Sequence, residues 1–139
     1  MKNIDFQALA EKAVGARERA YAPYSGFAVG AALITGDGKI YTGANIESAS
    51  YTPTVCAERV AVFTAVHAGE RDFKAIAIVG GKAGEPISAH CHPCGVCRQV
   101  LSEFGGGDLL IVTYDGKTVK VRELGEIFPE SFTKDNLHA

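Results

Sequence analysis

The sequence predicts a single α/β domain, spanning residues 1–139, in which helices pack against a mixed sheet of about five strands. Two observations support this fold class. Segments with apolar residues at helical spacing alternate with short apolar segments bounded by glycine turns, in the order α-β-β-α-β-α-β-β. A chain of 139 residues also fits one domain and can bury a hydrophobic core without disulfide bonds.

The N-terminal third predicts a helix followed by a hairpin. Residues 5–20 carry apolar side chains at steps of three and four, and Asp5 is placed to cap the helix N-terminus. Residues 27–35 and 39–46 have the composition of two strands, and the tight turn Gly36-Asp37-Gly38 joins them.

A second helix and a buried strand are expected next. The helix should begin near Thr52 or Thr54 and end at Gly69, because Pro53 suits a first helical turn and glycine a C-terminal cap. The wholly apolar run 75–79 is typical of a strand that is covered on both faces.

The C-terminal part predicts a third helix and a second strand pair. The helix spans residues 93–104, with Pro93 in its first turn, and the three glycines at 105–107 end it. Residues 109–114 and 118–122 then form two strands joined by a glycine-containing turn.

Charge and hydropathy exclude several classes of protein. The 14 Lys and Arg residues are balanced by 16 Asp and Glu residues without a basic cluster, so no nucleic acid polymer is expected as a partner. No segment approaches the ~18 consecutive apolar residues of a membrane span, and the N-terminus has no signal-peptide run. We therefore expect a cytoplasmic protein with reduced thiols, no membrane contact and a small-molecule substrate.

The four cysteines are unevenly spaced, which suits metal or redox chemistry better than disulfide bonding. Cys91, Cys94 and Cys97 lie within seven residues, and Cys56 lies 35 residues before the first of them. Cys94 and Cys97 share one face of a helix start, where partial positive charge favours the thiolate. Alone, this pair fits either a zinc site or a thioredoxin-like redox site.

The motif Cys56-Ala57-Glu58-Arg59 favours zinc over redox chemistry. Cys56 offers a third thiolate near another helix start, and three cysteines leave the fourth tetrahedral position open, as in catalytic zinc sites. Glu58 is then placed to act on a metal-bound water. Arg59 can donate to the sulfurs and offset their negative charge.

These two motifs resemble the zinc signature of the cytidine deaminases, in particular the small, homotetrameric, three-cysteine branch. The resemblance rests on residues 56–59 and 93–99 and extends over segments 21–33, 45–51 and 124–132. It implies a three-layer α/β/α sandwich, one Zn²⁺ per subunit and a homotetramer. It also implies hydrolytic deamination of cytidine and deoxycytidine to uridine and deoxyuridine, with release of ammonia.

The resemblance further implies a role for each site residue. The metal ligands would be Cys56, Cys94 and Cys97, with Glu58 as the catalytic proton carrier and Arg59 beside the sulfurs. Substrate contacts would come from Phe27 on the pyrimidine ring, Asn45 and Glu47 on the ribose hydroxyls, Tyr51 near the sugar, the Ala57 N–H on the base and Phe132 from a neighbouring subunit.

Several alternatives remain open from the sequence. The family usually has Ser-Pro-Cys where this chain has His92-Pro93-Cys94, so His90, Cys91 and His92 compete as metal ligands. A closed structural zinc module would use one of these three as its fourth ligand. A thioredoxin-like reductase would need only the Cys94 and Cys97 pair. A sister deaminase would act on another aminopyrimidine nucleoside, such as a nucleoside antibiotic.

Overall fold

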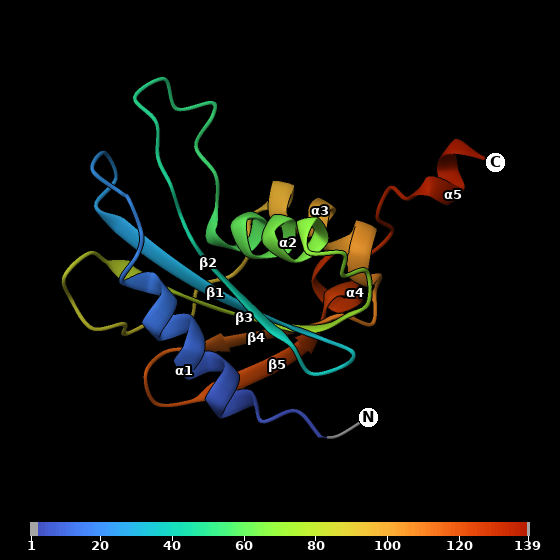
Figure 1. The fold of residues 1–139 in the computed structure, drawn as a ribbon, viewed down its shortest axis with the longest axis horizontal. Helices are drawn as coiled ribbons and strands as arrows, with labels where there is room; N and C mark the ends of the chain where they lie inside the picture. The colour runs from blue at the N-terminus through green and yellow to red at the C-terminus, as the bar shows by residue number, and fades with distance from the viewer. Residues whose placement is uncertain (1–2, 139) are drawn as a thin grey trace.

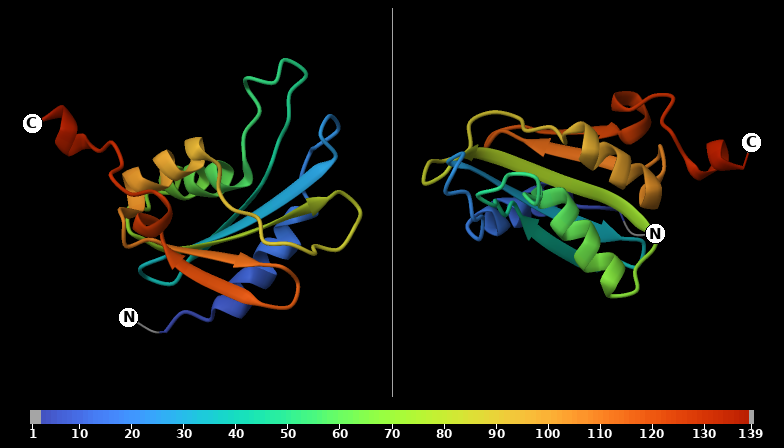
Figure 2. Two further views of the ribbon diagram at one scale, coloured as in Figure 1. Left: turned by 180° about the vertical axis from the view of Figure 1, so that it is seen from behind. Right: turned by 90° about the horizontal axis from the view of Figure 1, so that it is seen from above.

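In the computed structural model, which describes residues 3–138, five strands form one sheet with helices on both faces (Figures 1 and 2). The strand order is β2-β1-β3-β4-β5. Neighbouring strands are antiparallel except β3 and β4, which are parallel, so the predicted mixed five-stranded sheet is confirmed. The strands are β1 Phe27–Thr35, β2 Ile40–Ala44, β3 Phe73–Lys82, β4 Leu110–Tyr114 and β5 Val119–Glu123. Residues 1, 2 and 139 of the predicted domain lie outside the described residues.

Helices on both faces complete the three-layer sandwich. Helix α1 (Phe6–Arg17) covers one face, and helices α2 (Ala57–His67) and α3 (Gly95–Gly105) cover the other (Figure 2). Two short helices, α4 (Leu124–Ile127) and α5 (Lys134–Leu137), follow β5, and α5 ends a segment that projects from the body of the molecule (Figure 1). No helix within residues 3–138 is long and apolar enough to cross a membrane.

On each face of the sheet, a strand glycine allows a helix to pack closely against the strand backbone. A Cβ on Gly30 of β1 would lie 2.0 Å from the carbonyl oxygen of Ala13 in α1. A Cβ on Gly43 of β2 would lie 2.5 Å from both the Ala57 carbonyl oxygen and the Ala61 amide nitrogen of α2. The missing side chains therefore let α1 and the first turn of α2 rest directly on strand backbone.

The start of α2 differs from the prediction. It begins at Ala57, not near Thr52 or Thr54. Ile46 and Val55 exchange two backbone hydrogen bonds of 3.0 and 2.9 Å, which close the intervening residues into a loop. This long-range pairing prevents the helix from starting at Pro53, and it leaves Cys56 as the N-cap residue.

The other bounds are close to those expected. Strand β1 has the predicted bounds, whereas β2 ends at Ala44 and Ile46 only forms isolated bridges. Strand β3 is longer than the predicted 75–79, because its ends pair with β1 beyond the apolar run. Helix α3 begins at Gly95 instead of Pro93, since Cys94 has extended backbone.

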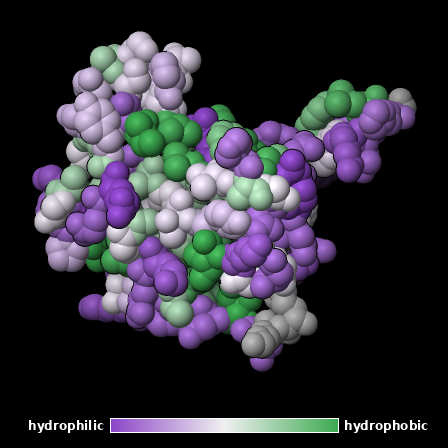
Figure 3. Space-filling view, in the orientation of Figure 1, coloured by the Kyte–Doolittle hydropathy of each residue, from purple (hydrophilic) through white to green (hydrophobic). Residues whose placement is uncertain are grey.

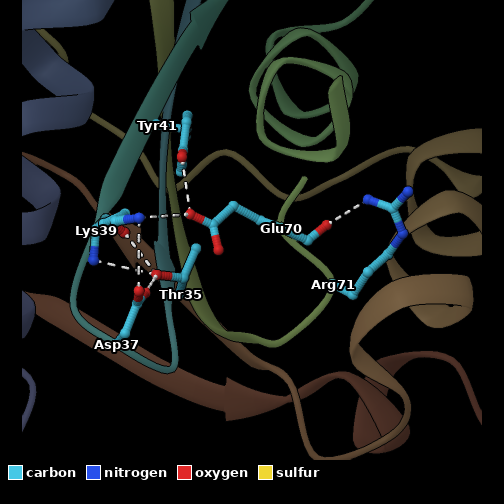
Figure 4. A network of polar contacts seen from close by, with 6 residues as sticks. All are labelled: Thr35, Asp37, Lys39, Tyr41, Glu70 and Arg71. Carbon is cyan, nitrogen blue, oxygen red and sulfur yellow. Dashed lines mark hydrogen bonds and ion pairs between the residues drawn. The ribbon is translucent and has the colours of Figure 1, made fainter. Parts of the chain in front are cut away.

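A polar network fixes the end of α2 that lies away from Cys56 (Figure 4). Tyr41 Oη donates to Glu70 Oε2 at 2.8 Å, and Lys39 Nζ lies 3.7 Å from the same oxygen. Arg71 Nη1 donates to the carbonyl oxygens of Glu70 at 2.8 Å and Val66 at 2.9 Å. These contacts tie the turn between β1 and β2 to the segment that leaves α2.

Candidate active site

The N-termini of α2 and α3 converge on the same face of the sheet, and a cysteine occupies the N-cap position of each. Cys56 and Cys94 have extended backbone, with ψ of 155° and 171°, and neither side chain caps its own helix. Cys97 follows in the first turn of α3 and is fully buried. The local helix starts therefore leave three sulfur atoms free to meet one another.

The three sulfur atoms form a compact group with the spacing of a zinc site. All lie within 4.8 Å of one another, and Cys56 Sγ lies 3.8 Å from Cys94 Sγ. Zinc–thiolate bonds of about 2.3 Å in a tetrahedron put sulfur atoms roughly 3.8 Å apart. The donor set and its spacing thus fit Zn²⁺, and the structure brings together the three predicted ligands.

The electrostatics of the three thiols also favour a cation. The hydrogen bond with the Cys97 thiol, followed by Arg59 and Cys94, lowers the pKa of Cys56 to about 5. The same pairing raises the pKa of Cys97, so a negative sulfur at Cys56 holds the proton on its neighbour. Three thiolates at this distance need a divalent cation to offset their mutual repulsion. Arg59 Nη2 donates to Cys56 Sγ at 3.6 Å, the contact expected from the sequence.

Glu58 lies beside the sulfur group, and only 4% of it is exposed. Burial raises its pKa to about 7; a hydrogen bond with its own backbone N–H opposes this shift, and the charge of Cys56 adds to it. A buried carboxyl group of this kind can hold or release a proton near neutral pH.

Arg98 is a supporting residue that the sequence reasoning missed. Its Nε donates to the Pro93 carbonyl oxygen at 2.8 Å, and its Nη1 donates to the Ile127 carbonyl oxygen at 2.5 Å. It thereby joins the segment before Cys94 to helix α4. The sequence signal was its place next to Cys97, but the partners of this half-buried guanidinium are visible only in the fold.

Asn45 and Glu47, the predicted ribose-binding residues, form hydrogen bonds with the chain's own backbone. Asn45 is 8% exposed; its Oδ1 accepts from Val29 N and its Nδ2 donates to Phe27 O, both at 2.8 Å. Glu47 Oε1 accepts from the amides of Tyr24 and Ser25 at 3.0 Å, and its second oxygen accepts from the Ser25 hydroxyl. Both side chains therefore fix the segment that leads into β1.

Phe27 and Tyr51 are exposed aromatic residues on different parts of this region. Phe27 opens β1 and is 45% exposed. Tyr51 is 70% exposed, has a positive φ of 62°, and packs edge-on against Tyr24 with ring centres 6.1 Å apart. Glu47 and Tyr51 share a cavity of about 310 Å³, which is also lined by Tyr24, Ser25 and Thr54.

Phe132 lies on the segment between α4 and α5, and 58% of it is exposed. Gln99 Nε2 donates to its carbonyl oxygen at 2.9 Å. The projecting arm that ends in α5 carries both hydrophobic and hydrophilic atoms on the face seen in Figure 3. The Phe132 backbone is therefore held against α3 while its ring is exposed.

The competing ligands suggested by the sequence have other surroundings. His90 Nδ1 lies 2.7 Å from Thr113 Oγ1, and His90 Nε2 lies 3.6 Å from Asp115 Oδ2. Cys91 is half-buried, and burial raises its pKa to about 11. His92 is exposed. The group of three sulfurs contains none of them.

Comparisons with known proteins support the site. A family model described as "Cytidine and deoxycytidylate deaminase zinc-binding region" matches residues 4–113. A cytidine deaminase of Sporosarcina psychrophila is 44% identical over 135 residues, covering 96% of each chain. The crystal structure of cytidine deaminase from Burkholderia pseudomallei has a TM-score of 0.84 at 47% identity, covering 93% of this chain and 100% of that chain. A blasticidin-S deaminase of Bacillus cereus is 32% identical over 110 residues, covering 77% of this chain and 78% of the relative.

Proposed function

The chain belongs to the cytidine and deoxycytidylate deaminase family and is a zinc-dependent deaminase, and we propose that its substrates are cytidine and deoxycytidine. Hydrolysis of the 4-amino group yields uridine or deoxyuridine and ammonia. The observation that carries this proposal is the group of three sulfurs at two helix starts, with buried Glu58 beside it. The names of the relatives with the higher identities support the choice of substrate.

The metal ligands in this proposal are Cys56, Cys94 and Cys97, with one zinc ion per subunit. When bound, zinc supplies the Lewis acidity that lowers the pKa of water to near neutrality. Arg59 donates to Cys56 and reduces the net negative charge around the three sulfurs.

Glu58 is the catalytic proton carrier. Its carboxylate accepts a proton from the attacking water and delivers it to ring nitrogen N3, and it then carries the proton of the new C4 hydroxyl group to the departing amino group as the C4 carbonyl forms. A C4–O bond forms as water adds, and the C4–N bond breaks as ammonia leaves. Its burial excludes bulk water, which would otherwise compete for the same proton.

The nucleoside is held by residues from several elements. Phe27 packs its exposed ring on the pyrimidine, and the Ala57 N–H at the start of α2 contacts the base. Asn45 and Glu47 bind ribose hydroxyls with the hydrogen-bonding capacity left over from their backbone contacts, and Tyr51 lies near the sugar.

A homotetramer completes the site in this proposal. The projecting C-terminal segment carries exposed Phe132 and Leu137, which can reach a neighbouring subunit. Exposed Phe63 on α2 and Val96 on α3 give these helices apolar surface for further subunit contacts. Loss of Phe132 should therefore lower activity through a neighbouring site.

We place residues 1–139 in a single deaminase domain and the enzyme in the cytoplasm. One sheet joins elements from both halves of the chain, which supports the domain assignment. The metal site needs three reduced thiols, and the cytoplasm keeps thiols reduced.

The test is the ultraviolet absorbance change of cytidine with purified, zinc-loaded protein. Deoxycytidine should also react, whereas adenosine and free cytosine should not. Blasticidin S serves as the comparator for the nucleoside-antibiotic alternative, because one relative is a blasticidin-S deaminase. Turnover of blasticidin S without turnover of cytidine would contradict the proposal, as would a zinc-loaded protein that turns over no nucleoside.

A further inference from the structure

Gly80 of β3 marks a place where two side chains from distant parts of the chain meet. A Cβ built on this glycine would lie 2.8 Å from Cys91 Sγ and 3.0 Å from Cε2 of Phe27. Both side chains therefore occupy the space directly above the Gly80 backbone, and any side chain there would displace one of them. The thiol of Cys91 and the exposed ring of Phe27 flank one small area of the sheet.

The sheet topology explains this meeting. Strand β1 pairs with one edge of β3, with Val29 opposite Gly80, so Phe27 lies near by on that side. On the other edge of β3, β4 pairs only as far as Ile78, and His90 then forms a bridge with Val79. The loop that leads into α3 thus takes the place of β4 and brings Cys91 beside Gly80.

Cys91 faces the same layer as the sulfur group. It packs against the core formed by α2, α3 and the sheet. Burial raises the pKa of Cys91, and the charges of Glu58 and Cys56 add to the shift. Cys91 therefore lies beside Phe27, on which the pyrimidine is proposed to pack, and in the layer that holds the sulfur group.

The orientation of the base follows from these positions. Glu58 and the Ala57 N–H come from the start of α2 and are proposed to hold the N3 side of the pyrimidine. Carbon 5 is bonded to carbon 4, the reacting carbon beside the sulfur group, so in this inference carbon 5 faces the segment that leads to Cys94. Cys91 is the residue of that segment that lies beside Phe27.

We propose that Cys91 is a specificity-determining residue whose small side chain sets the size of the substituent accepted at ring carbon 5. This inference rests on the deamination proposed above. The thiol is uncharged at neutral pH and has only weak hydrogen-bonding capacity, so it contacts the base as a small apolar group. The enzyme therefore accepts cytidines that carry a small apolar group at this carbon.

The test compares 5-methylcytidine with cytidine on the same zinc-loaded preparation of each variant. The measured quantity is the ratio of the two kcat/KM values, which cancels any loss of active protein. Wild type should turn over both substrates. We expect Cys91→Leu to lower the ratio at least fivefold, because one carbon too many in a hydrophobic pocket costs about 10–200-fold. Cys91→Ala should raise it.

Ser88→Leu is the matched control, because it adds bulk at an exposed position of the same loop. Its ratio should equal that of wild type. A fall smaller than fivefold in Cys91→Leu, or an equal fall in Ser88→Leu, overturns the inference.

A binding measurement keeps the inference testable if Cys91→Leu has too little activity. Calorimetry gives the Kd values of the products 5-methyluridine and uridine. The Kd of 5-methyluridine divided by that of uridine should be at least fivefold higher in Cys91→Leu than in wild type. An unchanged ratio of Kd values overturns the assignment of Cys91. Failure of the wild-type protein to deaminate cytidine at all would instead overturn the proposed function.

Discussion

On both faces of the sheet a strand glycine lets a helix pack closely, but the helix N-termini are capped by a side chain on one face only. On one face, α1 packs on Gly30 and its N-terminus is capped, since Asp5 Oδ1 accepts from Ala8 N at 3.0 Å. On the other face, α2 packs on Gly43, but Cys56 and Cys94 stand at the N-cap positions of α2 and α3 without capping them. A capping side chain stabilises a helix by about 1 kcal/mol, so the second face gives up that stabilisation at both helix starts.

Because Cys56 and Cys94 do not cap their helices, their sulfur atoms are available for metal binding. A cysteine whose sulfur does not bind its own helix can turn toward the sulfurs of another helix. The partial positive charge of each N-terminus then favours the thiolate. Within residues 3–138 the group of three cysteines that can hold a metal lies on the α2 and α3 face, and the α1 face holds no such group.

The largest expected effect is the loss of metal from the α2 and α3 face. Cys97→Ser should remove most of the bound zinc and all measurable deamination, because a buried hydroxyl group is a much poorer zinc ligand than a thiolate. Zinc per subunit, measured by atomic emission, checks this. Cys91→Ser should keep its zinc; loss of zinc from that variant would show that the three ligands have been assigned wrongly.

The next largest effect is on the proton carrier. Glu58→Gln should retain zinc and the wild-type melting temperature, but lower kcat by about 10²–10⁴-fold, because the amide cannot carry a proton. Glu11→Gln on α1 makes the same exchange at an exposed position of the other face and should leave kcat unchanged. Near-normal turnover by Glu58→Gln would show that Glu58 is not the proton carrier.

A pair of glycine variants tests whether packing and chemistry separate between the faces. Gly30→Ala and Gly43→Ala should each lower the free energy of unfolding by about 1–3 kcal/mol, since a Cβ overlaps helix backbone in both. Only Gly43→Ala should also weaken zinc binding, because it displaces the first turn of α2 that follows Cys56. Denaturation curves and competition with a zinc chelator measure the two effects. Equal zinc affinity in both variants would contradict the separation.

The smallest expected effect is on the α1 cap. Asp5→Ala should lower stability by about 1 kcal/mol through loss of the bond to Ala8 N, with zinc content and kcat/KM unchanged. Thermal unfolding and steady-state kinetics check this together. A change in kcat/KM without a change in melting temperature would mean that the two faces are coupled.

The sequence alone predicted helices packed against a mixed sheet, and the family resemblance added the three layers and the set of metal ligands. The strand 27–35, the Asp5 cap and the order of elements follow from local periodicity and turn chemistry, which act over a few residues. The pairing of Cys94 with Cys97 was also predictable, because i and i+3 spacing at a helix start puts them on one face. The family resemblance added Cys56 to the same site as a definite ligand.

The start of α2 could not be predicted from the same local signals. Pro53 suits a first helical turn, yet the bridge between Ile46 and Val55 keeps this segment in a loop. The contacts of Asn45 with Val29 and Phe27 depend likewise on how the strands lie together. Pairing between residues that are distant in the chain overrides local propensity, because it satisfies backbone groups that a helix would otherwise satisfy.

The sequence by itself predicted the α/β fold class and placed Cys94 and Cys97 on one helix face, since both depend on local spacing; the family resemblance selected Cys56 and Glu58 as their partners. Only the tertiary structure decided where Cys91 lies. The sequence made it a competitor for the metal, and it is the bridge from His90 to β3, together with the missing side chain of Gly80, that places it against Phe27. No local pattern encodes that contact, because it joins three segments that meet only when the sheet has formed.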